Sequence, residues 1–571
     1  MNDLSQRTRA WISADPDPST REELESLLES GEMAEVAERM DGTLTFGTAG
    51  IRGVVEAGSN RMNRASVMRT TRGLADFLLE RHAGSPRGPV VVGRDARTSS
   101  LRFMADTVGV LVAAGITVRF WPGHVPTPLV AYAVGELGAS AGVMITASHN
   151  PPRDNGYKVY DANGAQIVPP VDSAIAAAID RVGAARDVPR LEEALDGGHP
   201  GVLPIEDQLW QRYRRTVARG RLGSAGDRSL RIVYTPLHGV GWRFVREVLE
   251  EAGYDDIRPV REQMEPDGSF PTVDFPNPEE PGALDLALSL AEQVDADLVL
   301  ANDPDADRLA VAVAGPDGWL SLTGNQVGVL LGDYLLSRHD DRVTPLLINS
   351  IVSSPMAGFV AADYGARFET TLTGFKWIAN AALDIEATGE AVFLFGYEEA
   401  LGYSVGRAVR DKDGVSAALA LADLAAECRR DGRTLRDRLA NLYRRYGLWA
   451  SVQRSVRRPG SAGLAAIGTA MQNLVTSPPD RLAGIPVAGT TDYRVGARTR
   501  PRWLGAASLI SLDLDDGTRV LVRPSGTEPK LKIYVDAHVP VPGSGDPFAL
   551  EEPLVEKAGQ AADDLIGSLG I

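Results

Sequence analysis

Three aspartates at alternate positions form the first group that could carry chemistry. Asp303, Asp305 and Asp307 follow the apolar stretch LVLA in the segment NDPDADRLAV. Like charges about 5 Å apart repel by about 3 kcal/mol per pair at an effective dielectric near 20, so converging carboxylates need a positive partner. Oxygen ligands with no cysteine or histidine nearby suit a hard cation, Mg²⁺ more than Zn²⁺. An EF-hand is excluded, because its sixth position would be Arg308 and its twelfth Ala314. A solvated acidic turn stays open as the alternative.

A serine stands where a predicted strand ends. Ser148 follows the apolar residues 143–145 within TASHNPPRDNGYKVY, residues 146–160. In open α/β sheets, ligands bind beyond the carboxyl ends of the strands. The Asn, Pro, Asp and Gly residues that follow also fit an ordinary turn. Simple acyl transfer is disfavoured, because there is no G-x-S-x-G elbow and the adjacent His149 is expected to project away from the serine oxygen.

The segment RPSGTEPK, residues 523–530, could bind a phosphate group. Arg523 can grip a phosphate with two hydrogen bonds, and Ser525, Thr527 and the backbone N–H groups around Gly526 can supply further donors. An ordinary hairpin loop is the alternative for this segment alone.

The segment FGYEEALGY, residues 395–403, places two carboxylates after a strand-like run. Glu398 and Glu399 could each accept hydrogen bonds from sugar hydroxyls. A surface loop is equally consistent with this segment on its own.

Lysine is rare in this chain, and arginine supplies nearly every other positive charge. The lysines are Lys158, Lys376, Lys412, Lys530, Lys532 and Lys557. The first five fall inside segments that resemble motifs. Burial or neighbouring cations can lower the pKa of a lysine toward the range useful for proton transfer, which arginine cannot match. Lys532 and Lys557 also fit plain surface charge.

Length and composition limit the classes of protein to which this chain can belong. A chain of 571 residues is expected to form three or four domains. The formal charge of -17 disfavours nucleic acid and anionic membranes as partners. The single cysteine, Cys428, excludes an internal disulfide framework and is expected in a buried helix. No segment approaches the ~20 uncharged apolar residues of a membrane span, and the amino terminus lacks an apolar signal region, so we expect a cytoplasmic protein.

Short β-branched runs alternate with Ala/Leu-rich helical stretches, which predicts α/β architecture with largely parallel sheets. The expected strands are 89–93, 230–234, 296–302 and 391–396, and two expected helices are 65–82 and 100–115. Residues 518–537 predict two strands around a turn in a smaller α+β domain. The predicted domains are 1–205, with an amino-terminal helical extension, then 206–325, 326–445 and 446–571.

Six segments in this order resemble the phosphoglucomutase/phosphomannomutase family of α-D-phosphohexomutases. They are FGTAGIRG (46–53), TASHNP (146–151), DPDADR (303–308), LTGFKW (372–377), GYEEALGY (396–403) and RPSGTEPK (523–530). The resemblance spans about residues 40–540. Its first, fourth and fifth segments are most similar to the subgroup of phosphopentomutase-type and bacterial phosphoglucomutases.

The resemblance implies four domains around a central cleft, a phosphoserine, a Mg²⁺ site and a phosphorylated sugar as substrate. The implied metal ligands are Ser148, Asp303, Asp305 and Asp307, and the implied catalytic residues are Ser148, His149, Lys158, Arg52 and Lys412. Arg52 and His149 would orient the phosphate and the serine, while Lys158 and Lys412 would handle protons. The implied substrate-binding residues are Arg308, Thr373, Gly374, Lys376, Glu398, Glu399, Tyr403, Arg523, Ser525, Gly526, Thr527 and Lys530. Glucose 1,6-bisphosphate is the implied intermediate and activator.

Two departures affect the sugar loop. Ala400 stands where many members have serine, and Tyr403 stands where many dual-specificity members have histidine. The segment LTGFKW is more similar to the glucose-type loop, which ranks glucose phosphates first, mannose phosphates second and pentose phosphates third. A glucose 1,6-bisphosphate synthase, a Mg²⁺-dependent phosphatase and an inactive sugar-phosphate binding protein remain as alternatives. Oligomeric state is left open.

Overall fold

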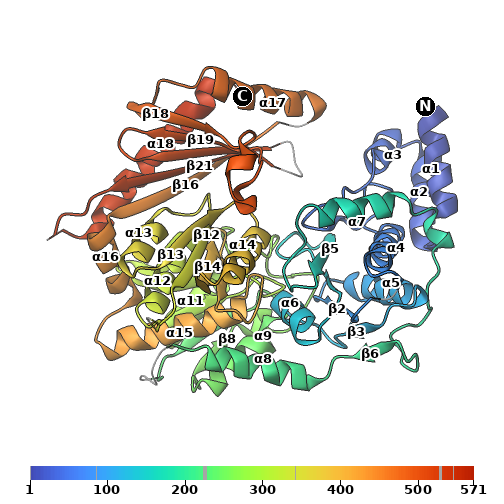
Figure 1. Ribbon diagram of the computed structural model, residues 1–571, viewed down its shortest axis with the longest axis horizontal. Helices are drawn as coiled ribbons and strands as arrows, with labels where there is room; N and C mark the ends of the chain where they lie inside the picture. The colour runs from blue at the N-terminus through green and yellow to red at the C-terminus, as the bar shows by residue number, and fades with distance from the viewer. Residues whose placement is uncertain are drawn as a thin grey trace. The chain divides into compact units, whose positions relative to one another are not determined.

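The computed structural model describes residues 2–84, 86–222, 228–340, 342–458, 460–525, 530–543 and 545–570. The chain forms two compact units, each described by itself below. The first comprises Met1–Arg221, Arg228–Ser321 and Gly402–Ala422, and the second comprises Leu222–Asp227, Leu322–Leu401 and Asp423–Ile571. Figure 1 shows the order of their helices and strands.

The first sheet of the first unit has the order β1-β5-β4-β2-β3-β6. Its strands are β1 (Ile51–Val54), β2 (Val90–Arg94), β3 (Val118–Phe120), β4 (Ala141–Ile145), β5 (Asp154–Asp161) and β6 (Val202–Pro204). The central strands are parallel, whereas β5 runs antiparallel to both β4 and β1. The continuous apolar sequence of β4 fits its complete burial.

Helices cover this first sheet, as Figure 1 shows in blue and teal. They are α4 (Arg64–Arg81), α5 (Ser100–Ala113), α6 (Thr127–Glu136) and α7 (Val171–Asp180), with the short η1 (Ala185–Asp187). Side chains of α4, α5 and α7 share one core with the strands, including Leu74, Phe103 and Ile175. The amino-terminal helices α1 (Asn2–Ala14), α2 (Pro18–Ser30) and α3 (Met33–Met40) form a separate small core in the segment predicted as a helical extension.

The second sheet of the first unit has the order β11-β10-β9-β7-β8. Its strands are β7 (Ile232–Thr235), β8 (Ile257–Pro259), β9 (Leu298–Ala301), β10 (Ala310–Gly315) and β11 (Gly318–Leu322). Strands β7, β8 and β9 are parallel, and β10 returns antiparallel to β9. The accompanying helices are α8 (Asp207–Arg219), α9 (Gly241–Glu251), α10 (Arg261–Met264) and α11 (Asp285–Val294).

The second unit contains two sheets of different construction. In the first, β12 (Pro345–Ser350) lies between β13 (Arg367–Thr371) and β14 (Val392–Glu398), and both pairs are parallel. The helices that accompany it are α12 (Gly324–Leu336), α13 (Met356–Asp363), α14 (Phe375–Thr388) and α16 (Leu435–Tyr446). The short β15 (Gly402–Val405) belongs to the first unit, and α15 (Gly414–Arg430) begins there and ends in the second. Cys428 is buried in α15, as expected.

The carboxyl-terminal sheet has the order β16-β21-β20-β19-β18-β17, and every adjacent pair for which a register is defined is antiparallel. Its strands are β16 (Leu448–Arg457), β17 (Arg481–Leu482), β18 (Ile485–Asp492), β19 (Ile510–Leu514), β20 (Arg519–Pro524) and β21 (Lys530–Val539). Its helices are α17 (Gly460–Thr476), α18 (Glu551–Leu569), η2 (Ala497–Thr499), η3 (Arg502–Leu504) and η4 (Pro547–Leu550). The predicted fold class, mixed α/β followed by a smaller α+β part, is confirmed.

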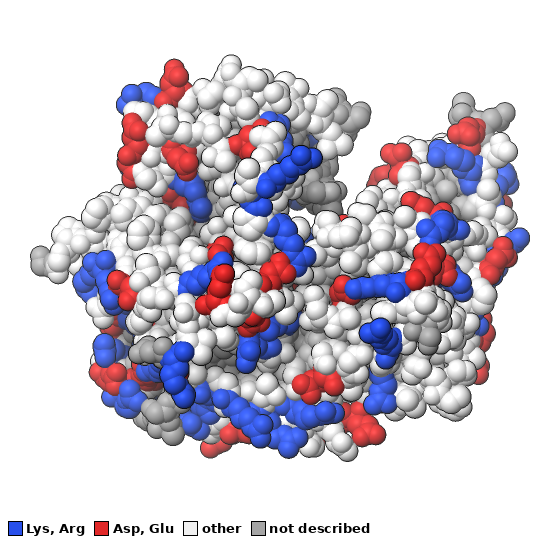
Figure 2. Space-filling model, viewed as in Figure 1, with Lys and Arg blue, Asp and Glu red and all other residues white. Residues whose placement is uncertain are grey.

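The predicted domain boundaries fall at or near element ends. Residue 205 lies between β6 and α8, residue 325 in the first turn of α12, and residue 445 in the last turn of α16. These boundaries stay predictions. Within the described ranges, no helix is both long enough and apolar enough to cross a membrane. Figure 2 shows acidic and basic side chains interspersed over the visible face.

Candidate active site

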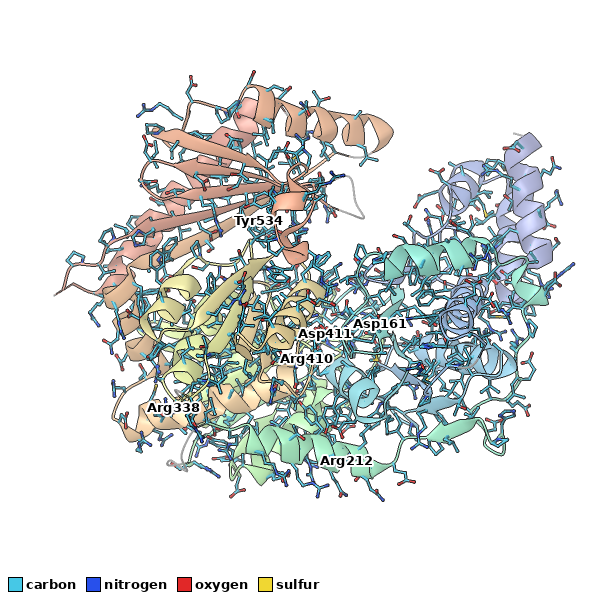
Figure 3. The ribbon with its side chains drawn as sticks, in the orientation of Figure 1. Asp161, Arg212, Arg338, Arg410, Asp411 and Tyr534 are labelled. Carbon is cyan, nitrogen blue, oxygen red and sulfur yellow. The ribbon has the colours of Figure 1, made fainter. Side chains whose placement is uncertain are left out.

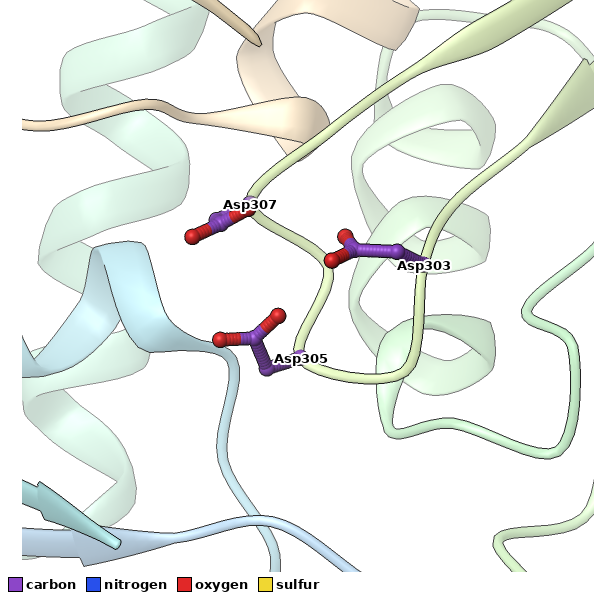
Figure 4. Close-up of side chains that lie close together, drawn as sticks. All are labelled: Asp303, Asp305 and Asp307. Carbon is purple, nitrogen blue, oxygen red and sulfur yellow. The ribbon is translucent and has the colours of Figure 1, made fainter. Parts of the chain in front are cut away.

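The three aspartates lie on the loop between β9 and β10. Figure 4 shows their carboxylates pointing into a common space. All three side chains are buried, and one ligand oxygen from each lies within 4.8 Å of the others. Ala306, between two of them, has φ 52°, a left-handed conformation that helps turn alternate side chains to the same side.

The neighbouring residues shift the pKa values of Asp303 and Asp305 in opposite directions. Burial and the neighbouring carboxylates Asp305 and Asp307 raise the pKa of Asp303 well above its ordinary value. Burial also acts on Asp305, but the charge and hydrogen bond of Lys158 outweigh it and lower the pKa of Asp305. Thr127 Oγ1 donates a further hydrogen bond to Asp305 Oδ2 at 2.6 Å. The pKa values of these two neighbouring carboxyls are thus shifted in opposite directions.

Ser148 reaches this cluster from the end of β4. Its Oγ donates a hydrogen bond to Asp303 Oδ2 at 2.7 Å, and Ser148 itself is 3% exposed. Its φ of 54° is strained for a residue with a side chain, and its backbone N–H donates to Thr146 Oγ1 at 2.8 Å. The strand end therefore presents one hydroxyl to the aspartates at a fixed position.

His149 lies on the other side of that hydroxyl. Its Nδ1 is 3.1 Å from Ser148 Oγ. Burial, reinforced by the charges of Arg308 and Arg52, lowers the pKa of His149 well below its usual range, so the ring is neutral. Because Ser148 Oγ already donates to Asp303, the geometry fits the tautomer whose Nδ1–H donates to the serine oxygen. The structure therefore brings His149 to the serine, whereas the sequence indicated that it would project away.

Two lysines neutralise the aspartates from different segments. Lys158, on β5, contacts Asp305 Oδ2 at 2.7 Å and Asp307 Oδ2 at 3.1 Å. Lys412 Nζ lies 3.1 Å from the same oxygen of Asp307. Burial opposes the charge of Lys158, but Asp305 and Asp307 favour it more strongly, so its pKa is raised. This is the reverse of the downward shift considered from the sequence, because the two carboxylates outweigh both burial and the neighbouring cation Lys412.

Glycine allows the loop of Lys412 to approach the aspartate loop. A Cβ atom on Gly414 would lie 2.4 Å from the backbone oxygen of Arg308 and 2.5 Å from Asn302 Nδ2. The backbone oxygen of Tyr403, whose ring is fully buried, accepts a hydrogen bond from Asp413 N at 2.7 Å. These contacts fix the segment on which Lys412 stands.

Arg52, predicted to orient the phosphate, and Arg308, predicted to bind substrate, also lie in the first unit. Arg52, exposed on β1, donates from Nη1 to Asn150 Oδ1 at 3.0 Å. The backbone N–H of Arg308 donates to Asp303 Oδ1 at 3.0 Å, and its Nη1 lies 3.4 Å from Glu279. Arg308 therefore lies on the aspartate loop itself, whereas Arg52 contacts the serine loop from β1.

Sequence reasoning missed Arg97 and Asp411. Arg97 is 2% exposed, and its guanidinium donates to four backbone oxygens around the serine, those of Ser148, Asn150, Pro151 and Asp154, at 2.6–2.8 Å. Its position just after the buried strand β2, parallel to β4, was the available signal. For Asp411 the available signal was its position next to the predicted Lys412, because an aspartate beside a functional lysine can orient it.

Asp411 ties the Lys412 loop to β5 and the segment after it. Its Oδ2 accepts hydrogen bonds from Tyr160 and Gln166, both at 2.8 Å, and its Oδ1 accepts from the backbone N–H of Lys412 at 2.8 Å. Tyr160 lies two residues from Lys158 on the same strand, so both lysines are anchored to β5. Figure 3 labels Asp411 beside Arg410.

The residues present fit a hard divalent cation. Among the described residues, Asp305 Oδ1 and Asp307 Oδ1 are buried and have no hydrogen-bond partner. Burying a charged oxygen without a hydrogen-bond partner costs free energy, which a bound cation would offset. Three converging carboxylates also supply the oxygen ligands that Mg²⁺ prefers. The donor set therefore agrees with a metal site at this loop.

The second unit carries the predicted sugar-binding residues except Tyr403, which lies in the first unit. Gly374, at the start of α14, has φ 110°, which favours glycine, and its N–H donates to Glu398 Oε1 at 2.7 Å. Ser350 and Ser353 donate to Glu399 Oε2 at 3.0 and 3.2 Å. Burial, then the charge of Glu398, raises the pKa of Glu399 to about 7. Thr373 and Lys376 are half-buried on either side of Gly374 and Phe375.

The predicted phosphate loop is only partly described. Arg523, the residue before the last of β20, lies beside Tyr534, to whose hydroxyl its Nη2 donates at 3.3 Å. The backbone N–H of Ser525 donates to Lys530 O at 2.7 Å, which closes the turn between β20 and β21. Gly526 and Thr527 lie outside the described residues. Arg523, Ser525 and Lys530 thus lie on the hairpin of the carboxyl-terminal sheet.

Comparison with known proteins supplies the family. Four models of the phosphoglucomutase/phosphomannomutase family match the chain in order: the alpha/beta/alpha domains I, II and III at residues 43–186, 211–316 and 323–446, and the C-terminal domain at 507–541. A protein assigned as a phosphomannomutase in Haemophilus influenzae is 41% identical over 85% of this chain and 95% of its own. The phosphopentomutase of Mus musculus is 34% identical over 97% of this chain and 93% of its own.

Solved structures agree with the sequence matches. A protein assigned as a phosphomannomutase from Thermus thermophilus superposes with a TM-score of 0.67 at 25% identity, covering 92% of this chain and 99% of the other. The phosphoglucomutase parafusin from Paramecium shares the fold, with a TM-score of 0.68 at 18% identity over 91% of this chain and 96% of its own. The chain belongs to the phosphoglucomutase/phosphomannomutase family and is a phosphomutase, an isomerase that moves a phosphoryl group within a phosphorylated sugar.

Proposed function

We propose that this phosphomutase interconverts glucose 1-phosphate and glucose 6-phosphate through a phosphoserine at Ser148. The observation that carries the proposal is the 2.7 Å contact between Ser148 Oγ and Asp303, within one buried group that also holds two more aspartates and two lysines. A hydroxyl fixed against carboxylates and cations is placed to carry a phosphoryl group, since phosphoryl transfer depends on positioning and charge neutralisation.

The residues of the first unit have different proposed roles in the transfer of the phosphoryl group. The bond between Ser148 Oγ and phosphorus breaks as a bond forms to the free hydroxyl oxygen of the sugar monophosphate, giving a bisphosphate. The hydroxyl proton passes to a lysine amine that is neutral at that step, for which Lys158 and Lys412 are the candidates. Because Asp305 and Asp307 raise the pKa of Lys158, Lys412 is proposed as the base and Lys158 as the acid. Arg52, Arg308 and His149 orient the phosphoryl oxygens and the serine. Mg²⁺ bound by Asp303, Asp305 and Asp307 would polarise the phosphoryl group and neutralise its charge.

The second half of the reaction reverses the first. The bisphosphate presents its other phosphate to Ser148, whose oxygen takes that phosphoryl group while the proton returns to the sugar oxygen. Arg523, Ser525, Gly526, Thr527 and Lys530 are proposed to bind the phosphate that is not reacting. The sugar is proposed to contact Thr373, Gly374, Lys376, Glu398, Glu399 and Tyr403. Glucose 1,6-bisphosphate is thus both the reaction intermediate and the activator that phosphorylates Ser148 when it carries no phosphoryl group.

Mannose phosphates are the second candidate substrates, in agreement with the name of the 41% identical relative, and pentose phosphates are the third. Relatives named phosphoribomutase in Saccharomyces cerevisiae and phosphopentomutase in Homo sapiens are 36% and 34% identical over 94% and 97% of this chain. A relative named glucose 1,6-bisphosphate synthase in Homo sapiens is 35% identical over 95% of this chain, which keeps synthesis of the bisphosphate from an external phosphoryl donor as a third activity to test. The segment LTGFKW, which resembles the glucose-type loop, places glucose first.

The experiment compares wild type with Ser148→Ala on each sugar 1-phosphate by ³¹P NMR, with Mg²⁺ and with or without trace bisphosphate. Glucose 1-phosphate is expected to convert to glucose 6-phosphate fastest, and Ser148→Ala is expected to lose at least about 10³-fold in rate. Faster conversion of ribose 1-phosphate would show that a pentose phosphate is the preferred substrate. The proposed phosphoserine mechanism would still hold. Release of inorganic phosphate would instead favour the phosphatase alternative.

A further inference from the structure

One threonine of the first unit binds both the side chain and the main chain of Asp305. Thr127, the first residue of α6, donates from Oγ1 to Asp305 Oδ2 at 2.6 Å, and its backbone N–H donates to Asp305 O at 2.9 Å. Both residues are fully buried. The first N–H groups of a helix have no acceptor within the helix, so the second bond also satisfies one of those of α6. The aspartate loop and the start of α6 are thus fixed against each other.

Helix α6 is a firm support for these two bonds. A Cβ atom on Gly93 of β2 would lie 2.5 Å from Val130 Cγ2, and one on Gly142 of β4 would lie 2.6 Å from Val134 Cγ2. Glycine at these two positions therefore lets α6 lie close against the sheet, and residues 127–134 are all buried. The position of Thr127 is set by the same sheet whose strand β4 leads to Ser148.

The threonine also joins two of the matched family domains within the first unit. Thr127 lies in the segment 43–186 that matches domain I, and Asp305 lies in the segment 211–316 that matches domain II. Lys158 Nζ, also from domain I, is a second donor to Asp305 Oδ2 at 2.7 Å, but it contacts Asp307 as well. The Thr127 hydroxyl is directed at Asp305, so it is the better placed of the two to set the orientation of that carboxylate.

We infer that Thr127 is a positioning residue for the divalent cation, because its hydroxyl holds the Asp305 carboxylate where it converges with those of Asp303 and Asp307. This convergence is visible in Figure 4. Mg²⁺ demands near-ideal octahedral geometry, with oxygen ligands at about 2.0–2.1 Å, so a carboxylate that turns away from the others is a poor ligand. The inference rests on the proposed metal site at these aspartates and adds a residue that does not itself contact the cation.

The test measures Mn²⁺ binding to the full chain by electron paramagnetic resonance, with Mg²⁺ as the competitor. Mn²⁺ prefers the same oxygen ligands as Mg²⁺. Thr127→Val keeps the shape of the side chain and the backbone N–H but removes the hydroxyl. It is expected to raise the Kd for Mn²⁺ about 10–100-fold, as is usual when a group that orients a metal ligand is lost. Thr127→Ser restores the hydroxyl and is expected to return the Kd close to the wild-type value.

A matched control and a second variant separate positioning from folding. Thr107 on α5 is equally buried and donates from Oγ1 to Phe103 O at 2.8 Å, so Thr107→Val removes a comparable hydroxyl away from the aspartates and is expected to leave the Kd unchanged. Melting temperatures measured without metal show which variants are folded. If Thr127→Val does not fold, Thr127→Ala is used in its place and is expected to show the same loss of affinity.

The outcomes distinguish this inference from the metal site on which it rests. A folded Thr127→Val protein that binds Mn²⁺ as tightly as wild type would overturn the role of Thr127 alone, and so would Thr127→Ser binding as weakly as Thr127→Val. Replacement of Asp303, Asp305 and Asp307 together by asparagine is expected to abolish Mn²⁺ binding. Unchanged binding in that triple variant would overturn the proposed metal site and this inference with it.

Discussion

Among the sugar-loop residues, the carboxyl of Glu399 has the charge state most sensitive to its environment. Burial, followed by the charge of Glu398, raises its pKa to about 7 from an ordinary value of 4.5, although Ser350, the backbone and Arg523 act in the opposite direction. The folded chain therefore binds a proton more tightly at this residue than the unfolded chain does. Its contribution to stability is fully present below pH 4.5 and is lost as the pH rises through about 7.

Glu399→Gln is expected to raise the melting temperature at pH 8 relative to wild type, because it removes a buried charge while keeping an acceptor for Ser350 and Ser353. The effect on the free energy of unfolding is expected to be about 1–3 kcal/mol at pH 8 and close to zero at pH 4. Calorimetry across this pH range measures it, with the exposed Glu556→Gln on α18 as the matched control. An equal shift at pH 4 and pH 8 would contradict the raised pKa.

The elements that carry the site are recognisable in the sequence to different degrees. Strands β4 and β9 are continuous apolar runs, so the loops after them, with Ser148 and the aspartates, could be predicted as ligand-binding ends. Arg97 and Asp411 could not, because their roles depend on which loops the folded sheet brings together: Arg97 lies 51 residues from Ser148, and Asp411 lies 251 from Tyr160. Arg52 is predicted from the family resemblance alone, whereas Lys412 is also marked by the rarity of lysine in this chain.

Arg97 holds the serine loop together by binding four of its backbone oxygens. Arg97→Met is expected to cost about 3–5 kcal/mol, because it leaves those oxygens without their donor and Asp95 without its cation. Limited proteolysis between residues 146 and 156 and the melting temperature measure the loss. Arg97→Lys keeps the charge and is expected to be intermediate. A wild-type cleavage rate in Arg97→Met would show that the loop does not depend on this residue.

Asp411 is expected to position Lys412 without touching substrate. Asp411→Asn is expected to lower kcat about 10–100-fold, because one amide oxygen cannot replace two carboxylate oxygens that accept from Tyr160, Gln166 and Lys412 N. Tyr160→Phe removes only one of these donors and serves as the milder comparison. Steady-state kinetics together with the melting temperature separate positioning from unfolding. A fall in stability with unchanged kcat would assign Asp411 a purely structural role.

At the scale of the whole molecule, the candidate metal ligands and both lysines that contact them belong to the first unit. A ligand that binds only the folded state stabilises the part that holds it, by about 2.7 kcal/mol at a hundredfold excess over Kd. The predicted sugar and phosphate contacts lie in the second unit, apart from Arg308 and Tyr403. Mg²⁺ and the sugar phosphate are therefore expected to stabilise different segments of the chain.

Mg²⁺ is expected to slow hydrogen exchange in peptides around residues 146–149 and 298–310 and to leave the carboxyl-terminal sheet unaffected. Hydrogen exchange with mass spectrometry, with and without Mg²⁺, measures this difference. The triple replacement of Asp303, Asp305 and Asp307 by asparagine is the control and is expected to abolish the protection. Protection confined to the second unit would place the metal elsewhere.

The most direct test of the account is whether Ser148 carries the phosphoryl group that the substrate receives. Protein treated with glucose 1,6-bisphosphate would be analysed by peptide mass spectrometry before and after a chase with glucose 1-phosphate in Mg²⁺. We predict one phosphate on the peptide containing Ser148, transferred to the sugar during the chase and absent from Ser148→Ala. A phosphate on another residue, or one released to water and not to the sugar, would contradict the account.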